Sequence, residues 1–427
     1  MKMIFYLLLV TLMINFNVAR AAAQSVEDIE AMTEVFGDGE HLSAVILTYD
    51  KLISAESVST DDFNVPDRTI SRAYVSEVQE KGKIADAGRY VVLELEPLPL
   101  VEQGMEAHPK EDREKREAKG FNGPTLGSHG NPHPLPTFTA EVKQIGTIKA
   151  VDGTIYSPTE KLTSSHTRQL IVEDFLQDVY EDSQQNGAKL VYNLYIPKNY
   201  DPQKNYPLVL FMHDAGAVSP EVKTAICQGL GAVVWANPEW QADHSCFVLA
   251  PQYDTVIVDD NYQYGPELDR TIHLIEDLSK KYSIDRKRIY NTGQSMGGMT
   301  SIAMDVKYPN FFAASYLVAC KWNAEVTSPL GQQNIWAVAA EGDPGAMPSM
   351  AEILGNLENA GAKIIRQTID ASGEQSKINE QVSSIIQPDC HIYYTLYTGG
   401  SHRYTWQHAY DMKPAMEWIF SQKNDRQ

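Results

Sequence analysis

The sequence predicts two folded parts, a small β-sandwich followed by a doubly wound, mostly parallel α/β sheet. Short alternating segments rich in β-branched and aromatic residues recur from about residue 26 to 172. From Lys189 onward, near-continuous apolar runs alternate with amphipathic segments, which is the order expected for parallel strands and their covering helices. The glycine-rich turn GQSMG at residues 293–297 stands between an apolar run and a helical segment, which is the strand–turn–helix order of such a sheet.

Composition and charge narrow the classes of partner. The chain has 427 residues, of which 43% are hydrophobic and 22% charged, so it can bury a sizeable core. Its formal net charge is −20, which disfavours contact with the phosphate backbone of nucleic acids or with anionic membrane surfaces. We therefore expect no nucleic-acid partner.

The first 23 residues have the pattern of a secretory signal peptide. Lys2 precedes an apolar run from Met3 to about Val18, and small residues follow, with cleavage expected after Ala21 or Ala23. The run is shorter than a confident membrane span. We predict a secreted or periplasmic protein whose mature chain has no membrane span.

The β-rich part is assigned to an immunoglobulin-like sandwich over residues 24–172, with strands near 41–51, 68–78, 88–97 and 138–150. A charged and then Gly/Pro/His-rich stretch interrupts it at about 102–137, which predicts a solvated, mobile insertion. His108, His129 and His133 lie there and are read as loop histidines, so no metal site is predicted. The oligomeric state, including association through this domain, stays open.

The α/β part is assigned to residues 173–427, after a hinge within 159–178. Apolar runs predict strands at 189–197, 206–216, 246–253, 288–293, 312–320, 335–343 and 390–400. Helical periodicity predicts helices at 266–283, 348–363 and 408–422. In such a sheet, ligands bind at the carboxyl ends of the strands.

Four cysteines, Cys227, Cys246, Cys320 and Cys390, are compatible with an oxidising compartment. All lie in or beside apolar runs, where free buried thiols are as plausible as disulfides. Three pairings are open, and no C-x-x-C motif suggests redox chemistry or a zinc ribbon.

Ser295 is the candidate nucleophile. It stands between Gly293 and Gly297 in a G-x-S-x-G pattern that follows an apolar run and precedes a helical one, which is typical of a nucleophile elbow. Glycines there remove Cβ atoms from a tight turn, and the helix directs its positive end at the serine. The alternative is a glycine-rich loop that only tightens strand–helix packing.

A serine nucleophile needs a base and an orienting carboxylate, in the chain order Ser, acid, His. After the elbow come His391, which begins a strand, His402, in a polar glycine-rich loop, and His408, which opens the last predicted helix. We predict His402 as the base. For the acid we favour Asp343 over Glu341, because Asp343 lies in the turn after a strand, and Asp370 and Asp389 lie outside such a context.

Acyl transfer also needs amide donors for an oxyanion. We predict the backbone N–H of Met296, directly after the nucleophile, and that of Ala215, with Asp214 as the alternative. His213 precedes the serine and is read as a brace for its loop. Trp322 is a candidate wall of the substrate pocket, and a core position is an equal alternative.

The motifs LFMHDAG, GQSMGG, EGDPGAMP and GGSHRYTWQHAYDMKPAMEWIFSQ together resemble an α/β-hydrolase esterase. They are most similar to the secreted "predicted peptidase" group, some members of which carry an immunoglobulin-like N-terminal domain. The stretches GDGEHLSAVILTYDK and GRYVVLELE resemble that domain. The resemblance implies Ser295, Asp343 and His402 as a triad, and hydrolysis of short-chain or aromatic carboxylic esters. In that group a proline often stands four residues after the acid, whereas here Pro348 is five after Asp343.

The sequence thus predicts a secreted serine carboxylesterase that forms an acyl-enzyme with a small ester and needs no cofactor. Two alternatives stay open. One is a serine peptidase of prolyl-oligopeptidase type acting on small peptides, since esters and amides share a tetrahedral intermediate. The other is a non-catalytic protein that binds carbohydrates or surfaces.

Overall fold

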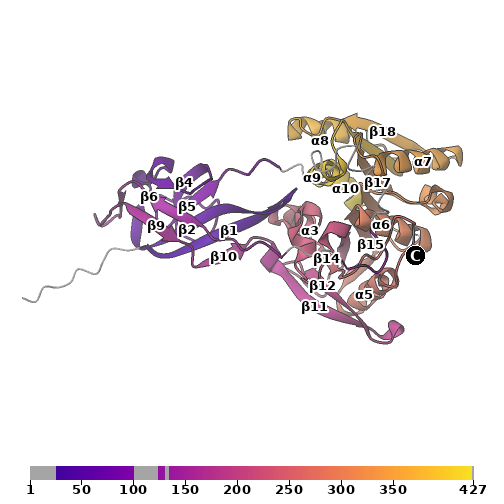
Figure 1. Ribbon diagram of the computed structural model, residues 1–427, viewed down its shortest axis with the longest axis horizontal. Coiled ribbons are helices and arrows are strands. Elements are labelled where there is room, and N and C mark those ends of the chain that lie inside the picture. The colour runs from indigo at the N-terminus through magenta and orange to yellow at the C-terminus, as the bar shows by residue number, and fades with distance from the viewer. Residues whose placement is uncertain (1–25, 101–123, 130–133, 426–427) are drawn as a thin grey trace, which may run out of the picture. The chain divides into compact units, whose positions relative to one another are not determined.

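The computed structural model describes residues 26–100, 124–129 and 134–425. The predicted signal peptide and most of the predicted insertion lie outside these residues. The described chain forms two compact units (Figure 1). The first holds residues 26–30, 45–95 and 140–165, and the second, α/β unit holds residues 31–44, 166–425 and the described part of 96–139. The division follows no single point in the chain, and the predicted domain boundary at 172/173 stays a prediction.

The N-terminal strands form antiparallel sheets, as the alternating sequence predicts. The larger sheet has the order β10-β1-β2-β5-β4 and the smaller one the order β3-β6-β9, with a separate β7-β8 ribbon. The strands are β1 (Val26–Phe36), β2 (Gly39–Ser54), β3 (Phe63–Asn64), β4 (Ile70–Ser76), β5 (Ala87–Leu95), β6 (Glu141–Gln144), β7 (Ile148–Lys149), β8 (Ile155–Tyr156), β9 (Thr159–Thr163) and β10 (His166–Gln169). Side chains such as Leu47, Val75 and Val91 are fully buried in this part.

The α/β unit is built on a sheet with nine strands among the described residues, in the order β11-β12-β14-β13-β15-β16-β17-β19-β18. The pairs β11–β12 and β12–β14 are antiparallel and the rest are parallel. The strands are β11 (Phe175–Asp182), β12 (Ala188–Tyr195), β13 (Tyr206–Met212), β14 (Phe247–Gln252), β15 (Ile284–Gln294), β16 (Ala314–Val318), β17 (Ile335–Ala340), β18 (Ile364–Ile369) and β19 (Ile392–Tyr397). The predicted fold class is confirmed.

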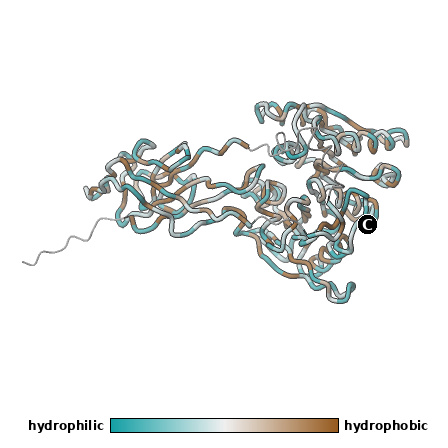
Figure 2. The backbone as a smooth tube through the Cα atoms, in the orientation of Figure 1, coloured by the Kyte–Doolittle hydropathy of each residue, from teal (hydrophilic) through white to brown (hydrophobic). Residues whose placement is uncertain are grey.

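Helices cover both faces of this sheet, which explains the continuous apolar runs of its strands. In β13, Val209 and Phe211 belong to one core, with α2, α3, α4, α8, α9 and α10, whereas Leu208 and Leu210 belong to the other, with α5, α6 and α7. The helices are α2 (Thr224–Cys227), α3 (Leu230–Ala236), α4 (Pro238–Asp243), α5 (Glu267–Lys281), α6 (Met296–Lys307), α7 (Ala346–Asn359), α8 (Gln375–Ser384), α9 (His402–Ala409) and α10 (Lys413–Ser421). Hydrophobic and hydrophilic segments alternate along the described part of the chain (Figure 2).

The C-terminal end of the chain differs from the prediction. The single helix expected from residue 408 is two helices, α9 and α10, because Pro414 can occupy the first turn of a helix but not its interior. His402, expected in a loop, is the first residue of α9, and the hydroxyl of Ser401 accepts the Tyr404 amide to cap it. His408, expected to open a helix, lies in the last turn of α9.

Part of the predicted insertion, residues 124–129, is held by backbone hydrogen bonds to a neighbouring loop, although most of its residues are exposed. The Gly127 amide donates to the Val256 carbonyl at 2.8 Å, and the Val256 amide donates to the Ser128 carbonyl at 2.8 Å. His129 Nδ1 lies 3.0 Å from the carbonyl oxygen of Asp254. Polar composition indicated a solvated loop here, but backbone pairing, which composition does not report, fixes this part of it.

The four cysteines are free and buried. Burial raises the pKa of the Cys246 thiol to about 12, so this thiol stays protonated and unreactive at neutral pH. Within the described residues, no helix is both long and apolar enough to span a membrane, and no cluster of three or more His, Cys, Asp or Glu could hold a metal ion.

Asp305, a fully buried residue of α6, makes stability depend on pH. Burial raises the pKa of its carboxyl to about 7, although hydrogen bonds from Ser315 and Asn291 oppose the shift. Oδ1 accepts from Asn291 Nδ2 at 3.0 Å. The folded protein therefore keeps a proton that the unfolded chain releases near pH 4. Stability contributed by this protonated carboxyl is lost as pH rises through about 7.

We expect the wild type to lose about 3 kcal/mol of unfolding free energy between pH 5 and pH 8 relative to Asp305→Asn. Denaturant unfolding of both proteins at the two pH values measures this difference. Parallel pH dependence in the two proteins would show that Asp305 is ionised when folded.

Candidate active site

The G-x-S-x-G turn gives Ser295 its unusual backbone. Ser295 joins β15 to α6 with φ 53° and ψ −116°, a region that costs a non-glycine residue roughly 1–3 kcal/mol. The flanking glycines permit the close packing: a Cβ on Gly293 would lie 2.5 Å from the Gly297 carbonyl carbon, and one on Gly297 only 1.9 Å from the Met212 carbonyl oxygen. The turn thus holds Ser295 at the carboxyl end of its strand, partly exposed.

Three predicted residues that are far apart in the chain meet at this edge of the sheet. Ser295 Oγ lies 2.9 Å from His402 Nε2, and His402 Nδ1 lies 2.5 Å from Asp343 Oδ2. His402 reaches the other two from the start of α9, and Asp343 does so from the turn between β17 and α7. The imidazole is therefore bracketed by a hydroxyl and a carboxylate, one at each ring nitrogen.

Asp343 is fixed in its orientation. Its side chain is 3% exposed, and Oδ1 accepts from the amides of Gly345 and Ala346, both at 2.9 Å. Burial by itself would raise the pKa of Asp343, but the hydrogen bonds from His402 and these amides outweigh burial and hold the pKa below its usual value. The carboxyl is therefore an anion at neutral pH, with Oδ2 aimed at His402.

The alternatives to these residues lie elsewhere. Glu341 is exposed, and its Oε2 accepts the Gly399 amide at 2.9 Å. Asp389 pairs with Lys363, and Asp370 accepts from Ser372. His391 is exposed and lies 3.0 Å from Asn334 Oδ1. His408 packs on Tyr404 with ring centroids 4.4 Å apart, and burial lowers its pKa.

His213 is fully buried and braces two loops. Its Nε2 accepts the Tyr253 amide at 3.0 Å, and its Nδ1 lies 2.8 Å from the Asp214 carbonyl, so Nδ1 carries the proton. Burial lowers the pKa of His213, and the ring is neutral. It ties the loop after β13 to the end of β14 and does not reach Ser295.

A hollow of about 350 Å³ surrounds these groups, and Ser295, His402 and Asp343 line it together with Met296 and Ala215. Met296 begins α6, and Ala215 begins a 3-10 turn, Ala215–Ala217. Apolar side chains that line the rest of the hollow are Pro124, Val258, Met299, Ala319, Pro344 and Ala346. Lys321 and Asp260 form an ion pair in the lining, with Nζ and Oδ1 3.0 Å apart.

Trp322 is not among the residues that line this hollow. It is 4% exposed, belongs to the core beneath α6 and α7, and contacts the ring of Tyr262 with centroids 5.5 Å apart. Trp322 thus lies in the core, which was the alternative to a place in the pocket wall. Lys321, its neighbour in the chain, lines the hollow instead.

Sequence reasoning missed a pair of side chains behind the site. Gln294, next to the serine and 1% exposed, donates from Nε2 to Asp214 Oδ2 at 3.1 Å. Asp214 Oδ1 accepts the Gly216 amide at 2.7 Å. This pair links the strand end that carries Ser295 to the loop that carries Ala215. A polar side chain directly before the candidate nucleophile was the one signal for it.

Comparison with known proteins shows which families and structures the chain is similar to. Residues 28–157 match the family described as "Esterase Ig-like N-terminal domain". No curated protein matches the chain. Among solved structures, a thermostable esterase is 27% identical, with a TM-score of 0.73, over 93% of this chain and 100% of that one.

Two other solved structures are less similar. A fluorophosphonate-binding serine hydrolase of Staphylococcus aureus is 11% identical, with a TM-score of 0.41, over 58% of this chain and 98% of that one. A ferulic acid esterase of Anaeromyces mucronatus is 13% identical, with a TM-score of 0.39, over 58% and 90%. These two likenesses are too weak to support an argument. The match of the N-terminal domain and the fold shared with the thermostable esterase confirm the resemblance of the motifs: the chain is a hydrolase of the α/β-hydrolase esterase type with an immunoglobulin-like N-terminal domain.

Proposed function

We propose that this enzyme is a serine carboxylesterase that works through an acyl-enzyme, with Ser295, His402 and Asp343 as its triad. The observation that carries the proposal is the continuous relay from Ser295 Oγ through both nitrogens of His402 to a buried, ionised carboxylate. A free serine hydroxyl is a weak nucleophile, and such a relay is what activates it.

The reaction follows from these positions. Ser295 Oγ attacks the ester carbonyl as His402 Nε2 takes its proton, and Asp343 stabilises the imidazolium at Nδ1. The amides of Met296 and Ala215 would bind the oxyanion. When the tetrahedral intermediate collapses, the proton on Nε2 passes to the leaving alkoxide. Water then attacks the acyl-enzyme with His402 as the base, which releases the acid and restores Ser295.

The hollow at Ser295 supports a short acyl group. Its volume of about 350 Å³ is near the lower end of small-molecule sites, and its wall is largely apolar. Rates on p-nitrophenyl acetate, butyrate and a long-chain ester, on a feruloyl ester and on a proline-containing peptide test this. We expect the acetate or butyrate to be turned over fastest and the peptide not at all.

Faster cleavage of the peptide would support the peptidase alternative. Reaction with a fluorophosphonate probe separates a working site from a vestigial one. An active relay should give one label at Ser295, and a folded protein that takes no label and turns over no ester would contradict the proposal.

Export is also proposed. The apolar run after Lys2 and the small residues around Ala21 and Ala23 support it. N-terminal sequencing of the protein recovered outside the cytoplasm should begin at residue 22 or 24. An intact Met1 on that protein would contradict cleavage.

Asp214 is expected to position the loop that carries Ala215, because it holds both the Gly216 amide and Gln294. Asp214→Ala should lower kcat for ethyl acetate about 10- to 100-fold with little change in KM, since a misplaced oxyanion donor acts on the transition state. Asp214→Asn should retain most activity. The Oδ1 of the asparagine can still accept the Gly216 amide. Its side-chain NH₂ can donate to Gln294 Oε1, which has no hydrogen-bond partner in the wild type.

Kinetics of both variants on the same ester test this role. Full activity in Asp214→Ala would show that the loop needs no such support. An Asp214→Asn protein as impaired as Asp214→Ala would show that the charge of Asp214, rather than its hydrogen bonds, is what matters.

A further inference from the structure

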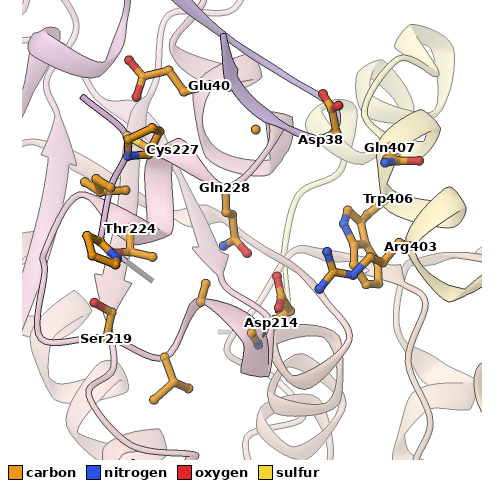
Figure 3. Close-up of a pocket in the computed structure, with 17 residues that line it drawn as sticks. Asp38, Glu40, Asp214, Ser219, Thr224, Cys227, Gln228, Arg403, Trp406 and Gln407 are labelled. Carbon is orange, nitrogen blue, oxygen red and sulfur yellow. Dashed lines mark hydrogen bonds between the residues drawn. The ribbon is translucent and has the colours of Figure 1, made fainter. Parts of the chain in front are cut away.

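A second hollow, of about 430 Å³, lies beside the candidate active site, and all 17 residues that line it belong to the α/β unit (Figure 3). Its wall combines four separate parts of the chain with α9. These parts are the turn between β1 and β2 (38–40), the segment 134–136, the loop after β13 (214–219) and the region of α2 (224–228). The proposed mechanism assigns no role to this hollow.

Residues next to one another in the chain line the two hollows, close to the proposed catalytic His402. Ala215 lines the hollow at Ser295, while its neighbours Asp214 and Gly216 line the second one. His402 lines the first, and Arg403 lines the second. The ring of Trp406 also lines the second hollow and stands edge-on to the His402 ring, with centroids 4.9 Å apart. The loop 214–216 and the first turns of α9 thus contribute lining to both hollows.

The positions that the acyl group and the leaving alcohol take in the proposed reaction distinguish the two hollows. The acyl carbon bonds to Ser295 Oγ, and the apolar hollow beside Ser295 can hold the acyl group. The leaving oxygen must lie at His402 Nε2, because that atom supplies its proton. The alcohol attached to this oxygen therefore extends past His402, toward the side that Arg403 and Trp406 line.

The polar groups of the second hollow are held in place beforehand. Asp38 lies 2.9 Å from His41 Nε2, and Asp214 accepts from Gly216 and Gln294. Figure 3 shows the guanidinium of Arg403 pointing toward Asp214, with the side chain of Gln228 on the other side of Asp214 in this view. Hydrogen bonds from the protein fix the orientation of these carboxylates. Each carboxylate still has further lone pairs that can accept hydrogen bonds from the hydroxyl groups of a ligand.

The remaining wall selects against charged alcohols. Three carboxylates, of Asp38, Glu40 and Asp214, and one guanidinium, of Arg403, line the hollow, so its net charge is negative and an anionic group is repelled. Each of these carboxylates already accepts hydrogen bonds from the protein, as Glu40 does from Gln169 Nε2 at 2.9 and 3.0 Å, and the positive charge of Arg403 opposes a second cation beside it. The indole of Trp406 offers a flat apolar surface beside these donors and acceptors, as a ring with hydroxyls on its edge and C–H groups on its face requires.

We propose that the second hollow binds the alcohol part of the ester and that this part is an uncharged, hydroxyl-rich ring, such as a sugar residue. The inference rests on the proposed esterase function. It predicts that the enzyme distinguishes acetate esters by their alcohols, since hydrogen bonds to the alcohol that strengthen as the bond breaks raise kcat/KM.

Three esters with the same acetyl group test this: ethyl acetate, a methyl glucopyranoside carrying one acetyl group, and acetylcholine. We expect kcat/KM for the glucopyranoside to exceed that for ethyl acetate by about tenfold or more. Leu135→Trp, which adds bulk to the wall of the second hollow, should lower this ratio about tenfold. Val326→Trp is the matched control, because Val326 is 45% exposed and lines a separate hollow beside Trp322.

The outcomes separate the subsite from the esterase function. Equal kcat/KM for the three esters, or an unchanged ratio in Leu135→Trp, would overturn the subsite while ester turnover and labelling of Ser295 stand. Preference for acetylcholine would overturn the uncharged alcohol in favour of a cation. No turnover of any ester and no labelling of Ser295 would instead overturn the esterase function itself.

Discussion

Ser295→Ala is expected to lower kcat for p-nitrophenyl acetate by about a million-fold, because the proposed mechanism has no other nucleophile. The substitution removes only one oxygen from a partly exposed side chain, so the midpoint of thermal unfolding should stay close to that of the wild type. Initial rates measured with wild type and variant at saturating ester give the change in kcat.

The matched control is Ser301→Ala in α6, the helix that follows Ser295. The Ser301 hydroxyl donates to the Gly297 carbonyl at 3.1 Å and lines neither hollow. This protein should keep its turnover within a few-fold of wild type. Full turnover by Ser295→Ala would remove the nucleophile from the account. An equal loss in Ser301→Ala would indicate that packing of α6, rather than the Ser295 oxygen, sets the rate.

Asp343→Asn is the second large effect, with kcat expected to fall about 10⁴-fold and KM to change little. The carboxylate keeps the proton of His402 on Nδ1, so that Nε2 is free to accept from Ser295. An amide can donate to Nδ1, which favours the tautomer with its proton on Nε2, where it blocks the base. Steady-state kinetics on p-nitrophenyl acetate measure both constants.

Glu341→Gln serves as its control, two residues away in the same turn. The glutamine carbonyl can still accept the Gly399 amide, so the turn is kept and activity should be unchanged. If Glu341→Gln were the inactive variant and Asp343→Asn the active one, the acid of the relay would have been misassigned.

The local features of the site could be predicted from the sequence. The turn around Ser295 is encoded within five residues, since two glycines permit its backbone and its packing against Met212. Chain order then left three histidines, of which His391 precedes the strand β19, His402 comes first after it, and His408 lies further on, in the last turn of α9. Its place at the start of α9 was missed because a glycine-rich stretch predicts a loop, while the Ser401 cap is a single residue.

Long-range contacts other than those among Ser295, His402 and Asp343 could not be predicted. The pairing of Asp214 with Gln294 joins residues 80 positions apart, and the wall of the second hollow joins residues 38–40 and 134–136 to α9. Residues 31–44 and 134–139 read as parts of the β-rich domain, yet they belong to the α/β unit. Periodicity reports which face of a strand is buried but not which distant segment covers it.

The acyl-enzyme itself tests the central claim most directly. Wild type mixed with excess p-nitrophenyl acetate and quenched in acid within the first turnovers should carry one added acetyl group, and peptide mapping should place it on Ser295. Ser295→Ala treated in the same way should carry none. An acetyl group on another residue that forms and decays at the rate of turnover, with Ser295 unmodified, would contradict the account.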